Sequence, residues 1–224
     1  MNITYLELPT RDLQFQMDYY SNVLGLPVMM SPVGLEVRAG KTDILFVRAS
    51  PDFDGAYHFA FNIPENQFRG ARHWVTERVP LLSDETGKVE FESSNWNSHS
   101  VYFKDSAGNV LEFIARHNLK NAVEGGFESG QVLNVSEIGL PSEDVIELAN
   151  DLCARLNLSV FNQQPNENFT PVGDDNGLFI LPIKDRIWIP NSGVPAKLLP
   201  LKVRGSAGDK EWEVRGYPYE ILQR

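Results

Sequence analysis

Glu112 is a carboxylate in a segment that otherwise has the pattern of a buried strand. It lies in Val110-Leu-Glu-Phe-Ile-Ala115, and because the side chains of a strand alternate between faces, it shares one face with Val110 and Ile114. Burying an unpaired carboxylate costs several kcal/mol, so Glu112 needs a metal ion, a basic partner, a proton or access to water. This requirement is the first indication of chemistry in the sequence.

The residues around Glu112 predict a β-hairpin. Two short apolar runs, 101–103 and 110–115, flank Asp105-Ser-Ala-Gly108, and these residue types supply the geometry of a tight turn. Two further polar residues belong to this hairpin, His99 at its start and Tyr102 in its first strand. Each also has an ordinary explanation, since a histidine beside serines at a loop edge is commonly solvated and a tyrosine in a sheet commonly packs.

The composition restricts the class of protein. The chain has 224 residues, of which 42% are hydrophobic, enough to bury a core in one or two domains. A net charge of −10 argues against nucleic acid or an anionic membrane as a partner, because both require a concentrated basic face. The start lacks a signal-peptide pattern, no window approaches the roughly 18 apolar residues of a membrane span, and the single cysteine, Cys153, fits a reducing compartment. We therefore expect a cytoplasmic globular protein.

One unit of sequence recurs three times. Residues 5–26 and 137–158 align without a gap at a constant offset of 132 residues, and residues 58–81 give the same strand, turn and helix with two extra residues. The positions shared by the first two segments are Leu8, Pro9, Asp12, Leu24 and Leu26, which recur as Leu140, Pro141, Asp144, Leu156 and Leu158. Such a period is typical of modules that bury their faces against one another.

The repeats define the predicted organisation of the chain. Each copy starts with an alternating strand, passes through polar cap residues into an amphipathic helix and ends in shorter strands. We therefore predict modules of one strand, one helix and three strands over residues 1–55, 56–117 and 132–190, with 118–131 as a linker. Residues 191–224 are too short for a full copy and predict a C-terminal hairpin, a truncated fourth module.

The second copy carries the most specific motifs. His58-Phe-Ala-Phe opens its first strand, and Asp105-Ser-Ala-Gly-Asn-Val-Leu-Glu112-Phe closes it. With the repeated unit and the Leu-Gly-Leu-like helix end, this pattern resembles the vicinal-oxygen-chelate superfamily, which groups glyoxalase I, extradiol dioxygenases and bleomycin or fosfomycin resistance proteins. The resemblance covers about 190 residues. It implies an α+β fold in which repeated βαβββ modules form a cupped, partly open mixed-sheet barrel with the helices outside.

The resemblance also implies where a divalent metal would bind. In that superfamily two modules form a cup, and the ligands are the opening residue of each first strand and a carboxylate of each last strand. The corresponding positions here are Tyr5 with Ile44 or Leu45 in the first module, His58 with Glu112 in the second, and Glu137 with an aliphatic residue near Leu181 in the third. The first module has lost both ligands. Strand alternation independently directs His58 and Glu137 away from the helix side and into the cup.

Which modules pair determines the ligand set. If the first and second modules form the cup, the chain supplies only His58 and Glu112. If the second and third pair, one imidazole and two carboxylates, those of His58, Glu112 and Glu137, would suit Fe, Mn, Ni, Co or Zn with positions left open for substrate. The second pairing is favoured because it explains an acidic residue at position 137. Alternatively, Glu137 is solvated at the rim of the cup or paired with Arg116.

Two functional hypotheses follow from the resemblance. The first is a metal-dependent lyase, isomerase or extradiol-type dioxygenase acting on a small substrate with vicinal oxygens, in which Glu112, His99 and Tyr102 are the candidate catalytic residues. The second is a metal-free protein that binds an aromatic or drug-like ligand, as resistance proteins do, and the lost ligands of the first module favour it. A homodimer is possible, because the number of modules leaves one without a full partner.

Overall fold

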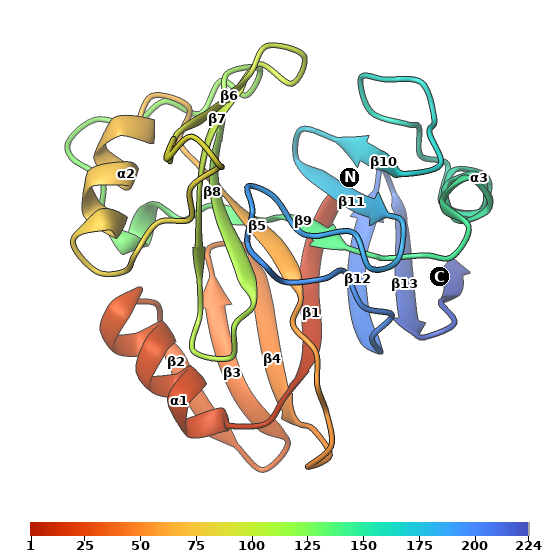
Figure 1. The fold of residues 1–224 in the computed structure, drawn as a ribbon, viewed down its shortest axis with the longest axis horizontal. Coiled ribbons are helices and arrows are strands. Elements are labelled where there is room, and N and C mark those ends of the chain that lie inside the picture. Colours follow the sequence, from red (N-terminus) through yellow and green to blue (C-terminus); the bar gives the residue numbers. More distant parts are fainter. Residues whose placement is uncertain (224) are drawn as a thin grey trace.

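Residues 1–223, which the computed structural model describes, form two seven-stranded mixed sheets with the helices on the outside (Figure 1). The predicted α+β class, with a cupped mixed sheet and outer helices, is confirmed. No helix within these residues is both long enough and apolar enough to cross a lipid bilayer.

The order of elements is a strand, a helix and two or three further strands, repeated, and then three final strands. The first sheet contains β1 (Asn2–Thr10), β2 (Val28–Ser31), β3 (Gly34–Ala39), β4 (Thr42–Arg48), β12 (Leu201–Ala207), β13 (Lys210–Gly216) and β14 (Glu220–Gln223). The second contains β5 (His58–Ile63), β6 (Phe91–Ser93), β7 (Ser98–Lys104), β8 (Val110–Arg116), β9 (Asn134–Gly139), β10 (Phe169–Asp174) and β11 (Gly177–Pro182). The helices are α1 (Leu13–Asp18), continued by the π-helical turn η1 (Tyr19–Val23), then α2 (Phe68–Thr76), the 3₁₀ turn η2 (Ser129–Gln131) and α3 (Val145–Leu156).

The second sheet joins strands of the second and third repeats. Its order is β10-β11-β9-β5-β8-β7-β6, so β5 lies between β8, to which it is parallel, and β9, to which it is antiparallel. Of the two pairings left open by the sequence, the pairing of the second copy with the third is therefore the one observed. The hairpin predicted around Glu112 is also confirmed, because β7 and β8 pair antiparallel along their whole lengths.

The first sheet is built in a similar way around β1. This strand pairs in parallel with β4 and antiparallel with β12, so the C-terminal strands complete the sheet of the first repeat. They do so with three antiparallel strands instead of the single hairpin that we predicted. Gly216 allows the additional turn, since its φ of 75° lies in the left-handed region that favours glycine, and β14 then returns along β13.

Two of the helices begin at the acidic cap residues expected from the sequence. Asp12 accepts hydrogen bonds from the backbone N–H groups of Gln14 and Phe15, and Asp144 accepts one from the N–H of Glu147. In α3 the predicted apolar stripe is buried along Val145, Ala149, Leu152 and Leu156. The helix therefore packs through one face, as its 3- and 4-residue spacing requires.

Thr42 connects the two sheets. Its hydroxyl donates a hydrogen bond of 2.7 Å to the carbonyl of Ile3 and accepts one of 3.0 Å from the N–H of Val135. Strands β1, β4 and β9 thereby meet at one buried side chain, with one large apolar core cluster around them. The sheet that carries β9 is thus anchored to the sheet that carries β1.

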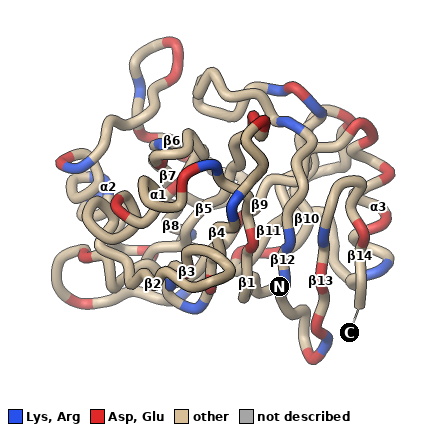
Figure 2. The backbone as a smooth tube through the Cα atoms, turned by 90° about the horizontal axis from the view of Figure 1, so that it is seen from below, with Lys and Arg blue, Asp and Glu red and all other residues tan. Residues whose placement is uncertain are grey.

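Acidic and basic residues are interleaved along the chain, as Figure 2 shows. On the first sheet they form cross-strand pairs: Lys202 Nζ lies 2.8 Å from Glu7 Oε2, and Arg204 Nε lies 2.7 Å from Glu213 Oε2. These pairs place a carboxylate beside each basic residue of β12.

Asp105, in the turn between β7 and β8, binds the first repeat to the second. Its carboxylate accepts hydrogen bonds from Gln16 Nε2 at 2.8 Å and from the Tyr20 hydroxyl at 3.1 Å, in addition to groups of its own turn. Asp105 is buried, and the burial raises the pKa of its carboxyl above the ordinary value. Asp105 is therefore the buried acceptor at the contact between the α1–η1 helix and the β7–β8 turn, to which Ser106 adds a hydrogen bond of 2.6 Å to Gln16 Oε1.

We expect Asp105→Ala to lower the free energy of unfolding by about 2–4 kcal/mol, because it leaves buried donors of Gln16 and Tyr20 without an acceptor. Urea denaturation monitored by circular dichroism measures the change. Asp84→Ala is the matched control: Asp84 also accepts backbone hydrogen bonds in a turn, from Thr86 and Lys88, but it is exposed. Equal losses in the two variants would contradict the assigned role of Asp105.

Candidate metal centre

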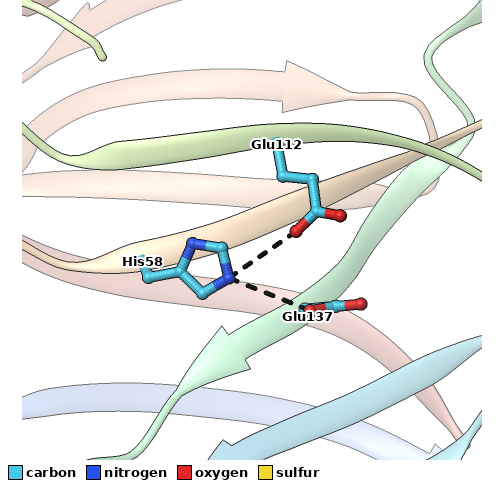
Figure 3. Close-up of side chains that lie close together, drawn as sticks. All are labelled: His58, Glu112 and Glu137. Carbon is cyan, nitrogen blue, oxygen red and sulfur yellow. Dashed lines mark ion pairs between the residues drawn. The ribbon is translucent and has the colours of Figure 1, made fainter. Parts of the chain in front are cut away.

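Three buried side chains from three adjacent strands converge on one point of the second sheet (Figure 3). His58 opens β5, Glu112 lies in β8 and Glu137 lies in β9, and they are 5%, 3% and 2% exposed. The Nε2 atom of His58 lies 3.8 Å from Glu112 Oε2 and 3.8 Å from Glu137 Oε2. One donor atom of each residue lies within 4.8 Å of the other two.

The register of the strands explains this convergence. Ala60 pairs with Glu112 across the parallel β5–β8 ladder and with Glu137 across the antiparallel β5–β9 ladder. Residues opposite each other in neighbouring strands point to the same face, so the two carboxylates flank the small side chain of Ala60. His58 lies two residues earlier on the same face, whereas Phe59 and Phe61 point into the core on the other side.

His58 is oriented for binding through Nε2. Its Nδ1 lies 3.0 Å from the backbone carbonyl of Val110, which requires the ring proton to be on Nδ1 in the neutral form. The lone pair of Nε2 then faces the two carboxylates. Burial by itself lowers the pKa of His58, but Glu137, Glu112 and the Val110 carbonyl together raise it above the ordinary value.

The two carboxylates form an unfavourable pair unless a cation joins them. Burial, and then the negative charge of Glu137, raise the pKa of Glu112 from 4.5 to about 7, although His58 and Arg116 act in the opposite direction. In the absence of a metal, the two carboxylates are therefore balanced by the Arg116 guanidinium and by protons held on His58 or Glu112. A divalent cation could take the place of those protons.

The donor set is suited to a divalent transition metal. With metal–ligand bonds of about 2.0–2.2 Å, ligand atoms lie about 3.0–3.5 Å apart. The two His58–carboxylate distances of 3.8 Å are close to this range, and all three donor atoms lie within 4.8 Å of one another, so binding requires the carboxylates to draw together. A second shell is already present, because the Val110 carbonyl fixes the ring of His58. This group can hold a metal ion through one imidazole and two carboxylates.

The fourth corner of the cup is apolar. Gly139 lies two residues after Glu137, as Ala60 lies two residues after His58, and Gly139 pairs with Ile180 of β11. Ile180 therefore occupies the position in the third repeat that Glu112 occupies in the second, one residue from the Leu181 suggested by the sequence. Three protein ligands from these four positions would leave coordination sites for substrate or water.

Tyr102 lies on the same face as the cluster. It pairs with Glu112 across the β7–β8 hairpin, it is 8% exposed, and its ring centroid lies 6.4 Å from that of His58. Burial, followed by the charges of Glu112 and Glu137, raises the pKa of its phenol well above 10.0. The hydroxyl therefore remains a hydrogen-bond donor at neutral pH.

His99 lies on the opposite face of the same strand. Alternation along β7 directs Tyr102 toward the cluster and His99 toward α2, where its ring lies 5.1 Å from that of Phe68. Its Nδ1 is 2.8 Å from His117 Nε2, and His117 in turn lies 3.3 Å from Glu65. The structure thus does not bring His99 to the cluster, and we do not include it among the residues proposed to act there.

Trp188 packs against His58 of the cluster and was not identified from the sequence. Its ring centroid lies 4.9 Å from that of His58, in the segment between β11 and β12. The indole packs on Gly139, where an added Cβ would lie 2.5 Å from the ring. An isolated glycine in a strand often marks a place where another segment packs closely. Gly139 was therefore the one feature of the sequence that could have indicated such a contact near Glu137.

Arg116 was considered from the sequence only as an alternative partner of Glu137, and the structure shows that contact. Its guanidinium is fully buried and forms an ion pair with Glu137 Oε1, while the other carboxylate oxygen faces His58. The two interpretations of Glu137 are therefore compatible, because its two oxygens have different neighbours.

We expect the metal-free protein to lose stability as the pH rises. Folding raises the pKa of Glu112 from 4.5 to about 7, so the stabilisation from its bound proton is complete below pH 4.5 and is lost as the pH passes about 7. The raised pKa of His58 acts in the same direction. Urea denaturation of chelator-treated protein at pH 5 and pH 8 should show a decrease on the order of 2 kcal/mol.

Glu112→Gln should flatten this pH dependence, because the amide does not titrate. Glu92→Gln, at an exposed glutamate of β6, is the control and should leave it unchanged. A pH dependence that is the same in Glu112→Gln and in the wild type would show that Glu112 does not carry the shifted proton.

Two solved structures with a similar fold are named as a glyoxalase I and a putative dioxygenase. A variant of glyoxalase I from Zea mays matches with a TM-score of 0.58 and 10% identity over 99% of this chain and 91% of that one. A putative dioxygenase from Bacillus subtilis matches with a TM-score of 0.57 and 16% identity over 81% of this chain, which spans 63% of the length of the Bacillus protein. Lactoylglutathione lyase from Agrobacterium tumefaciens matches with a TM-score of 0.40 and 23% identity over 50% of this chain and 91% of that one.

Comparisons of sequence give no corresponding match. No protein-family model matches the chain. No curated protein matches it either. The resemblance inferred from the repeats and the Asp105–Glu112 motif is confirmed by the structural neighbours at the level of fold. The chain therefore has the fold of the vicinal-oxygen-chelate superfamily.

Proposed function

We propose that this protein is a divalent-metal-dependent enzyme that acts on a small substrate with two neighbouring oxygen atoms. The observation that carries the proposal is the convergence of His58, Glu112 and Glu137 in a buried site on one face of the second sheet. The names of the structural neighbours, glyoxalase I and a putative dioxygenase, support the same class of chemistry. The β5–β9 pairing builds the site within one chain, so the proposed activity does not require a second copy.

The residues of the chain have separate roles in this proposal. His58 Nε2 and the two carboxylates hold the ion, and a bound divalent metal would act as a Lewis acid that polarises adjacent substrate oxygens. Glu112 or Glu137 would take a proton from one of the two oxygen-bearing carbons of the substrate and return it to the other, so that no proton is gained or lost overall. The Tyr102 hydroxyl orients a substrate oxygen, and Trp188 excludes water above His58.

The donor set favours proton-transfer chemistry over oxygen activation. Mononuclear non-haem iron oxygenases commonly use two histidines and one carboxylate. This site offers one histidine, His58, and two carboxylates, Glu112 and Glu137. An isomerase or lyase is therefore the preferred reaction class within the proposal.

The proposal predicts that chelator-treated protein, reloaded with Zn²⁺, Co²⁺, Ni²⁺ or Mn²⁺, binds about one ion per chain. Elemental analysis after gel filtration measures this ratio. His58→Ala and Glu137→Ala should lose the ion, whereas His99→Ala, which removes a histidine from the opposite face of the same sheet, should retain it. A wild type that binds none of these ions would remove the basis of the proposal and favour the metal-free ligand-binding alternative.

The reaction class has a separate test. The test substrates are an α-hydroxyketone and the adduct of a thiol with a 2-oxoaldehyde. In D₂O, the metal-loaded protein should exchange the hydrogen on their hydroxyl-bearing carbon for deuterium, and proton NMR measures the loss of that signal. Glu112→Gln or Glu137→Gln should slow this exchange by 10²-fold or more, on the order expected for a general base. Oxygen consumption with catechols by the iron-loaded protein, without such exchange, would assign the site to dioxygenase chemistry instead.

A further inference from the structure

The two carboxylates of the cluster have different surroundings. Arg116, the last residue of β8, forms an ion pair with Glu137 through Nη2 and Oε1, and its side chain is 0% exposed. The remaining oxygen of Glu137, Oε2, is the one that faces His58 Nε2 at 3.8 Å. The carboxylate of Glu137 is thus divided between the guanidinium and the metal-binding point.

Few other groups compete for the guanidinium of Arg116. Its Nη1 lies 3.9 Å from Asp175 Oδ1, beyond hydrogen-bond distance, and within residues 1–223 its Nε and Nη1 have no hydrogen-bond partner. The rings of Trp96 and Phe161 cover it, with centroids 5.5 Å and 5.9 Å from its central carbon. Because a guanidinium cannot lose its proton in a protein, Glu137 faces a permanent positive charge.

Glu112 has no comparable anchor. In the part of the chain that the structure describes, its ion-pair contact is with His58 at 3.8 Å, and no lysine or arginine lies within ion-pair distance of it. Across the β7–β8 hairpin it faces Tyr102, which is neutral. Its hydrogen-bonding neighbours, Tyr102 and Ser100, are neutral hydroxyl groups. Its carboxylate can therefore reorient without leaving a permanent positive charge unpaired.

We infer that Arg116 is a positioning residue that fixes Glu137 as a ligand through one oxygen, and that Glu112 is consequently the carboxylate that exchanges with substrate and transfers the proton. Giving both oxygens of Glu137 to an ion, or withdrawing that carboxylate, would remove the only hydrogen-bonded partner that the buried guanidinium has among the described residues and leave the more distant Asp175, at 3.9 Å, as its ion-pair contact. Reorientation of Glu112 breaks contacts with neutral hydroxyls and a titratable histidine, but it leaves no guanidinium unpaired. This inference rests on the proposed function, because it assigns different tasks to two ligands of the same ion.

Binding of Co²⁺ tests the inference without requiring a substrate. For the chelator-treated wild type, the dissociation constant is measured by competition with a chromophoric chelator, and the visible spectrum of the bound Co²⁺ reports its ligand geometry. We expect Arg116→Gln to weaken binding about 10- to 100-fold and to change the spectrum. Arg116→Lys keeps the charge but not the planar guanidinium, so its dissociation constant for Co²⁺ should lie between those of the wild type and of Arg116→Gln. It replaces Arg116→Gln in the test if that variant does not fold.

A double-mutant cycle distinguishes positioning from general destabilisation. If Arg116 acts through Glu137, then Arg116→Gln combined with Glu137→Gln should bind Co²⁺ no more weakly than Glu137→Gln alone. Glu112→Gln should weaken binding less than Glu137→Gln, because the mobile ligand contributes less to affinity. Circular dichroism of each variant confirms that the folded protein is being compared.

Arg204→Gln is the control, because it removes one of the two arginine partners of another buried glutamate, Glu213, in the other sheet. It should leave the Co²⁺ affinity and spectrum unchanged. The inference is overturned if Arg116→Gln also leaves both unchanged, or if its effect adds in full to that of Glu137→Gln. A wild type that binds no Co²⁺, Zn²⁺, Ni²⁺ or Mn²⁺ would instead overturn the proposed function, and the inference with it.

Discussion

The antiparallel pairing of β5 with β9 is the interaction on which the candidate site depends. It places Glu137 opposite Ala60, on the face that also carries His58 and Glu112. Glu137 comes from a strand that begins more than seventy residues after the start of β5. Backbone hydrogen bonds hold this register, and a slip of one residue would turn Glu137 to the other face. A sheet ladder therefore supplies the geometry that brings the two buried carboxylates together.

Much of this arrangement is determined locally and could be predicted from the sequence. Alternation within a strand fixes which residues share a face, so the phases of His58, Glu112 and Glu137 follow from the aromatic and aliphatic residues around them. The repeated strand–helix pattern identifies the modules for the same reason, since amphipathic periodicity is a property of short segments. The acidic caps Asp12 and Asp144 are also local signals, because each binds amides two or three residues away.

The rest depends on contacts between distant segments, which no local pattern specifies. His99 was placed near the site because it belongs to the same hairpin as Glu112, but its face is set by its packing against Phe68 of α2. Trp188 lies in a segment without strand periodicity, and only tertiary packing brings it to His58. Arg116 lies on the same face of β8 as Glu112, which alternation predicts. Its contact with Glu137, however, forms only when β9 pairs in the sheet.

The first sheet shows that the fold itself does not require the acidic cluster. Around β1, Glu7 occupies the place of Ala60, with Leu45 on the parallel neighbour and Lys202 on the antiparallel neighbour, where the second sheet has its two glutamates. Lys202 forms an ion pair with Glu7, and Leu45 is apolar, so these positions are electrically balanced within the protein. In the second sheet the same positions hold two buried acids with only Arg116 and a titratable histidine against them. Because one architecture accommodates both sets, the close pair of buried acids is a property of this site and not of the fold, and in the second sheet its balance depends on Arg116 and on titratable protons that a cation could replace.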